Sequence, residues 1–90
     1  MTDITSSCTF YKGFCGDLKV MTIVTSAAAA SSNTIDLGSD SAGGYINTIL
    51  NTLLQDDAGA DKTCTWVPST GIITLGTITT GIHNLVVVGV

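Results

Sequence analysis

The chain has 90 residues, of which 44% are hydrophobic and only 11% are charged, and its formal net charge is −4. This length makes one domain, and the charged fraction is well below the roughly 25% that is usual for soluble domains. The only basic residues are Lys12, Lys19 and Lys62, which is too few for the phosphate-binding surface of a nucleic-acid-binding protein or for a polybasic membrane contact. We therefore expect no nucleic-acid partner, no membrane partner, and a surface that other protein molecules partly cover.

Residues 1–15 are predicted to form an N-terminal arm or docking segment, and residues 16–90 a single β domain. The arm begins with polar residues and then carries three aromatic side chains without a clean period. We interpret these aromatics, Phe10, Tyr11 and Phe14, as candidate docking residues; the alternative is a frayed terminus with a few core anchors. The chain shows no pattern typical of a secretory signal and no apolar run of the ~18 residues that cross a bilayer.

The first strong strand is predicted over residues 17–25 (DLKVMTIVT), because branched side chains suit a pleated surface. Val20 falls on one face of this strand and Ile23 on the other, so we expect both faces to be at least partly covered. A linker of small residues follows over residues 26–33. Residues 34–37 (TIDL) then predict a short strand, and residues 38–44 a loop rich in serine, aspartate and glycine.

Residues 45–55 fit two kinds of element. Their apolar side chains recur at the spacing of an amphipathic helix. Their polar positions are asparagine and threonine, which are poor helix formers, and a strand would also place several apolar residues on one face. The pattern alone leaves helix and strand equally open.

A turn is predicted over residues 56–62 (DDAGADK), where aspartate usually hydrogen-bonds its own backbone. We favour that interpretation over a weak Ca²⁺ site, because the usual calcium-loop spacing and its closing glutamate are missing. A hairpin follows, with Cys64 and Trp66 pointing inward from its first strand. Its turn is predicted at residues 68–71 (PSTG), since proline presets φ and glycine accepts a positive φ.

The last strand is predicted over residues 83–90 (HNLVVVGV). Its apolar run has no polar break, which is typical of a strand covered on both faces. Together these elements predict an all-β fold, a small sandwich or barrel of about six or seven short strands, with a helix over residues 45–55 as the alternative. The predicted core residues are Val20, Ile23, Trp66, Ile73, Leu75, Val86 and Val88.

The residues that carry chemistry are few. The three cysteines, Cys8, Cys15 and Cys64, are an odd number, which favours half-buried free thiols over a disulfide between Cys8 and Cys15. With His83 they reach the four ligands of a zinc site, but no pair has the usual ligand spacing. No cysteine-hydrolase signature, nucleophile elbow or phosphate loop is present. We therefore expect no cofactor, no metal and no catalytic residues, and we do not expect an enzyme.

Three segments together resemble small virion proteins of tailed bacterial and archaeal viruses. These segments are GDLKVMTIVT at residues 16–25, NTIDLG at residues 33–38 and TWVPSTGIITLGTITTGIHNLVVVGV at residues 65–90. The resemblance implies a compact β-sandwich or β-barrel on the virion exterior and favours a strand over residues 45–55. It implies a capsid decoration (cement) protein, with residues 1–14 as the specific docking arm.

The expected function is therefore that of a virion structural protein, a decoration or minor capsid subunit that stabilises the shell by protein–protein contacts. Its expected partners are the major capsid protein or other virion proteins and further copies of itself, and its expected location is the extracellular particle. The alternatives are a filament subunit that assembles by strand exchange and a small glycan- or receptor-binding module.

Overall fold

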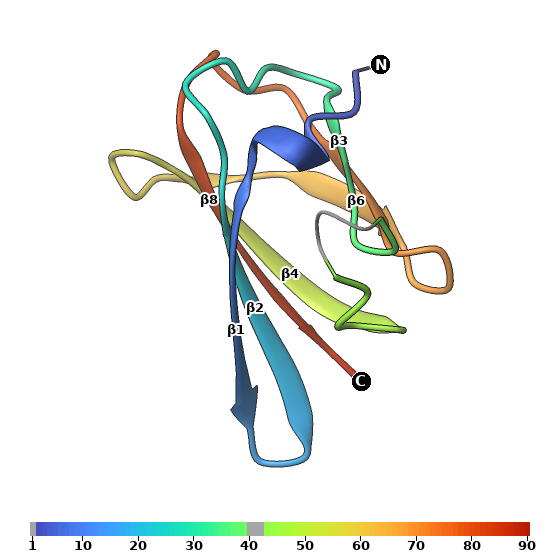
Figure 1. The fold of residues 1–90 in the computed structure, drawn as a ribbon. Coiled ribbons are helices and arrows are strands. Elements are labelled where there is room, and N and C mark those ends of the chain that lie inside the picture. Colours follow the sequence, from blue (N-terminus) through green and yellow to red (C-terminus); the bar gives the residue numbers. More distant parts are fainter. Residues whose placement is uncertain (1, 40–42) are drawn as a thin grey trace.

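The computed structural model of the chain describes residues 2–39 and 43–90, and their regular secondary structure is β apart from one short 3-10 turn (Figure 1). Part of the loop predicted over residues 38–44 lies outside the described residues. A single 3-10 turn, η1 (Thr5–Ser7), precedes the strands. In chain order the strands are β1 (Thr9–Cys15), β2 (Leu18–Val24), β3 (Thr34–Asp36), β4 (Ile49–Asp56), β5 (Asp61–Lys62), β6 (Cys64–Val67), β7 (Ile72–Leu75) and β8 (His83–Gly89). The predicted all-β class is confirmed.

The strands form two antiparallel sheets in a sandwich-like arrangement. One sheet has the order β1-β2-β8-β4-β5 and the other the order β3-β7-β6. The chain passes from the first sheet to the second at Thr63, since Lys62 pairs with Leu54 of β4 and Cys64 pairs with Leu75 of β7. The predicted hairpin of residues 63–75 is present as β6 and β7, and Gly71 closes its turn with φ 74°.

The N-terminal segment is not a separate arm, because its second half, β1, is an edge strand of the five-stranded sheet. β1 pairs along its whole length with β2, and Gly16, with φ 63°, lies in the two-residue turn between them. The β1–β2 hairpin reaches beyond the rest of the fold (Figure 1). Before it, the chain lies along β3, where the Thr34 N–H donates to the Thr2 carbonyl at 2.8 Å.

Residues 45–55 contain a strand rather than a helix, but the strand begins only at Ile49. The preceding residues pair with the end of the chain, where the N–H groups of Asn47 and Thr48 donate to the Val90 carbonyl at 2.9 and 3.1 Å. The register of β4 against β8 shifts between Ile49 and Asn51. Such a bulge adds one residue to the strand, so the buried positions no longer alternate strictly, and their spacing imitates that of a helix.

The core lies between the two sheets. Its fully buried side chains from the five-stranded sheet and the three-stranded sheet are Met21, Ile23, Leu54, Leu85, Val87, Ile35, Ile73 and Leu75. Trp66 is half-buried against this cluster. Three residues expected in the core, Val20, Val86 and Val88, lie instead on the opposite face of the five-stranded sheet. Their neighbours along β2 and β8 take the inward positions, so the expectation that β8 is fully covered on both faces was wrong.

Candidate interaction surface

The face of the five-stranded sheet that points away from the core is unusually poor in charge. The register defines it in rows: Tyr11 lies opposite Thr22, Thr22 opposite Val86, and Val86 opposite Leu53. We call this surface the outer sheet face. Its members on β1, β2, β8 and β4 are Thr9, Tyr11, Gly13, Cys15, Leu18, Val20, Thr22, Val24, Asn84, Val86, Val88, Asn51, Leu53 and Gln55. None of these side chains is charged. The fifth strand, β5, adds a charged residue at the edge of this face, because Asp61 lies opposite Gln55 and accepts a hydrogen bond from its amide at 3.1 Å.

Large apolar side chains stand exposed on the outer sheet face. Tyr11 is 60% exposed and Leu53 is 47% exposed, while Val86 and Val88 between them are half-buried. A hollow of about 210 Å³ lies over Leu53, Val86 and Val88, and another lies beside Tyr11 and Val20. An apolar, uncharged and gently hollowed sheet face is the kind of surface that soluble proteins usually cover with a partner.

The three predicted docking aromatics do not form one patch. Tyr11 lies on the outer sheet face, whereas Phe10 and Phe14 point to the other side of β1, because side chains alternate along a strand. Phe10 is half-buried against the core, and Phe14 is 74% exposed near the hairpin tip. Leu53 and Asn51 belong to the outer sheet face but were not among the predicted site residues. Strict alternation from Leu54 would have indicated Leu53, had the bulge not obscured it.

The inner side of the β1–β2 hairpin is held by Tyr45. Its phenol hydroxyl donates to the Gly13 carbonyl at 2.7 Å, and the Lys19 ammonium donates to the Tyr45 carbonyl at 3.0 Å. Lys12 and Lys19 lie 5.7 and 5.4 Å from the ring centroid, within cation–π range. The Phe14 ring meets the same ring edge to face at 6.0 Å. Tyr45 therefore braces a hairpin that otherwise projects from the fold.

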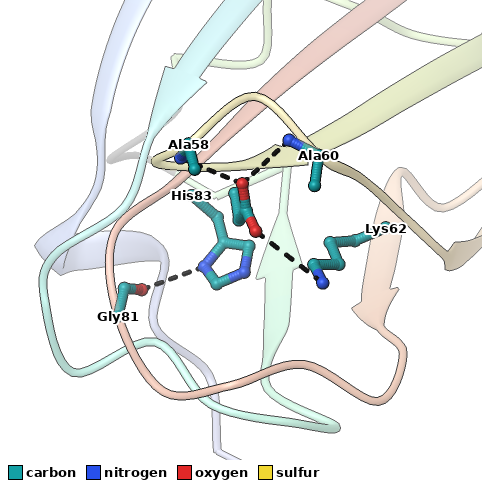
Figure 2. A network of polar contacts seen from close by, with 6 residues as sticks. Ala58, Ala60, Lys62, Gly81 and His83 are labelled. Atoms are coloured by element: carbon teal, nitrogen blue, oxygen red, sulfur yellow. Dashed lines mark hydrogen bonds and ion pairs between the residues drawn. The ribbon is translucent and has the colours of Figure 1, made fainter.

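A polar corner forms where β4 ends and β8 begins (Figure 2). Oδ1 of Asp56 accepts the N–H groups of Ala58 and Ala60, both at 2.9 Å, and Oδ2 lies 3.7 Å from the Lys62 ammonium. Asp56 thus caps its own turn, as the sequence predicts, although the turn is shorter than expected because Asp61 already belongs to β5. The neighbouring ring of His83 is 2% exposed, and its Nδ1 lies 3.0 Å from the Gly81 carbonyl.

The chemistry of this corner is structural. A carbonyl can only accept, so the proton of a neutral His83 ring lies on Nδ1, and the buried Nε2 has no hydrogen-bond partner among the described residues. The carboxylate of Asp56 is already occupied by the turn and by Lys62. Within residues 2–39 and 43–90, no three histidine, cysteine or acidic side chains come together as metal ligands.

Hydrogen bonds from the N–H groups of Ala60 and Ala58 lower the pKa of Asp56, and the charge of Lys62 acts in the same direction. Because the folded-state pKa lies below its unfolded value, the carboxylate stabilises the fold above the unfolded pKa. This stabilisation is lost as the pH falls through the folded-state pKa. We expect Asp56→Asn to lower the urea midpoint at about pH 7 and to flatten its fall toward about pH 3. Asp57→Asn, at an exposed neighbour in the same turn, is the control, and an equal effect there would contradict this role.

The three cysteines are free thiols in different surroundings. Cys8 is half-buried with Sγ 3.3 Å from the Ile4 carbonyl, and burial, aided by the charge of Asp3, raises the pKa of its thiol to about 11. Cys64 lies with Sγ 3.2 Å from the Thr52 hydroxyl, and Cys15 is exposed beside the hairpin turn. Among the described residues, His83 hydrogen-bonds to the Gly81 carbonyl and to none of these thiols, so no cysteine–histidine pair is formed.

No helix in the part of the chain that the structure describes is long and apolar enough to cross a membrane.

Comparisons of the chain with protein-family models, with curated proteins and with solved structures find no match.

Proposed function

We propose that the chain is a structural subunit of a virus particle, a capsid decoration or minor capsid protein that binds other virion proteins and further copies of itself. The observation that carries the proposal is the outer sheet face, a surface of four strands with no charged side chain and with Tyr11 and Leu53 exposed. Covering these four strands with protein buries apolar area and none of their side chains is charged, which is the favourable case for a stable interface. The sequence resemblance to virion proteins gives the class of partner.

The position of β8 weighs against the alternative of a filament subunit that donates its C-terminal strand. β8 lies between β2 and β4 and is paired on both edges, and the last residue, Val90, exchanges hydrogen bonds with Thr48. Donation of this strand would open the centre of the five-stranded sheet. The half-buried position of Trp66 likewise weighs against a glycan site built on that side chain.

The test is incorporation into particles. Virions assembled in cells that express the wild-type chain or Leu53→Lys are purified, and the copies of the chain per particle are counted by quantitative mass spectrometry. We expect Leu53→Lys to reduce the copy number roughly tenfold or more, because an unpaired ammonium would be buried in the interface. Thr65→Lys is the matched control, since it adds the same charge to an exposed strand position of the other sheet. Absence of the wild-type chain from particles, or equal loss of both variants, would refute the proposal.

A further inference from the structure

Among the described residues, no strand pairs with the edge of β1 that faces away from β2. On the side of β2 that faces β8, the Thr25 N–H donates to the His83 carbonyl at 3.0 Å. Ladder bonds alternate between the two sides of a strand, so the even-numbered residues of β2 bond to β1. Their partners in β1 are its odd-numbered residues. The main-chain N–H and C=O groups of Phe10, Lys12 and Phe14 therefore point away from the sheet, and no hydrogen bond of the described residues reaches them.

Every other sheet edge in the described part of the chain is short, bent or covered. β5 has two residues, and β6 has four and adjoins the bend at Thr63. β3 is covered by the N-terminal segment, whose Ile4 N–H donates to the Thr34 carbonyl at 2.9 Å. β1 is seven residues long, contains no proline and carries a single charge, that of Lys12. A long uncovered edge of this kind is a template for pairing with another strand.

We propose that two copies of this chain pair β1 with β1, antiparallel across a two-fold axis, and so join their five-stranded sheets into one continuous sheet. We take a second copy as the partner because, among the edge strands of the described residues, only β1 has the length to pair along the whole of β1. Antiparallel pairing of identical edges is self-complementary, and it closes as a dimer rather than growing into a fibre.

The charge of Lys12 selects the register. With the axis at Lys12, the two ammonium groups would lie directly opposite each other, which is unfavourable. With the axis at Tyr11, residues 9–13 of the two copies pair, each Lys12 faces Phe10 of the second copy, and the two Tyr11 side chains form a cross-strand aromatic pair. An axis at Gly13 would pair the same number of β1 residues, but Tyr11 would face Cys15 and the aromatic pair would be lost. The geometry therefore places the axis beside Tyr11.

This dimer specifies the contact between copies in the proposed assembly, but it rests on the β1 edge alone. The outer sheet face remains open in the dimer, so failure of capsid binding would leave the inference standing, and loss of the dimer would leave the capsid proposal standing. Sedimentation-equilibrium analysis of the purified chain over a concentration series measures the dimer directly.

Variants at Lys12 test the role of the main chain. Lys12→Pro removes an outward N–H, and proline is tolerated in an edge strand at such a position. We expect the dimer Kd to rise roughly tenfold or more, since each copy loses an interface hydrogen bond. Lys12→Ala keeps the N–H and is expected to remain dimeric, as is Leu53→Lys on the outer sheet face. A monomeric wild-type chain, or a dimer that Leu53→Lys breaks and Lys12→Pro does not, would overturn the inference.

Cysteine cross-linking tests the register and does not depend on the folding of the proline variant. In a Cys15→Ser background, Tyr11→Cys places two thiols at facing positions about 4.5 Å apart between Cα atoms, which suits a disulfide. Thr9→Cys is the control, because the two copies of residue 9 would lie four positions, or about 13 Å, apart. Oxidation is expected to link the Tyr11→Cys dimer only. Efficient linking through Thr9→Cys, or none through Tyr11→Cys, would refute this pairing.

Discussion

Replacing Leu85 by alanine is expected to lower the free energy of unfolding by about 3 kcal/mol, within the range measured for leucine deletions in protein cores. Leu85 is fully buried in β8, the central strand of the five-stranded sheet, and it pairs with Ile23 on one side and Leu54 on the other. A domain of this size has a total stability of roughly 5–13 kcal/mol. The loss is therefore a large share of the total, and urea unfolding followed by circular dichroism measures it.

Val86→Ala is the matched control for this prediction. Val86 is the next residue of the same strand, but its side chain points to the outer sheet face and is only half-buried. Truncation there is expected to cost less than about 1 kcal/mol, because little buried area is lost and no enclosed cavity forms. Equal losses for the two variants would mean that β8 is covered on both faces, as the uninterrupted apolar run alone predicted.

Gly89→Ala is expected to destabilise the fold by about 2 kcal/mol, the usual scale for overpacking a tight site. A Cβ at this position would collide with the Thr48 carbonyl and would lie 2.5 Å from a methyl group of Ile46. The backbone cannot easily move aside, because Thr48 and Val90 exchange hydrogen bonds at 3.0 and 3.1 Å. The close approach of the two segments therefore requires glycine, and thermal and urea unfolding report the cost.

Gly13→Ala is the control, since Gly13 is also a strand glycine. A Cβ there would meet no atom within 4 Å, and the backbone of Gly13 does not have a positive φ. Alanine reduces the freedom of the unfolded chain, so this variant is expected to be neutral or slightly stabilising. A loss at Gly13 as large as the loss at Gly89 would show that general strand effects, rather than the contact with Thr48, explain both results.

These stability measurements also determine how the assembly experiments are interpreted. Leu53 and Tyr11 are exposed, so substitutions there are expected to leave the unfolding free energy within about 0.5 kcal/mol of the wild-type value. A variant that folds normally but leaves the particle, or fails to cross-link, then reports on an interface. The outer sheet face and the β1 edge can be tested separately in this way, because Leu53→Lys changes only the face and Lys12→Pro, compared with Lys12→Ala, removes only a main-chain donor of the edge.

Local chemistry in the sequence determined the all-β class and several turns. Branched residues and frequent glycines predict short strands. Residues 68–71 form the turn expected of them, and Asp56 hydrogen-bonds the backbone of the turn that follows it. These features depend on φ preferences and on hydrogen bonds between near neighbours. A single sequence records such preferences directly.

Only the tertiary structure decided which face of each strand is buried and which strand lies at an edge. The run from Leu85 to Val88 has no polar residue to mark its outer side, so Val86 and Val88 were expected in the core. Likewise, nothing local shows that β1 pairs with β2 alone or that the bulge near Ile49 shifts the pattern of β4. Strand order and sheet facing depend on contacts between residues far apart in the chain, and those contacts place both the outer sheet face and the open edge of β1.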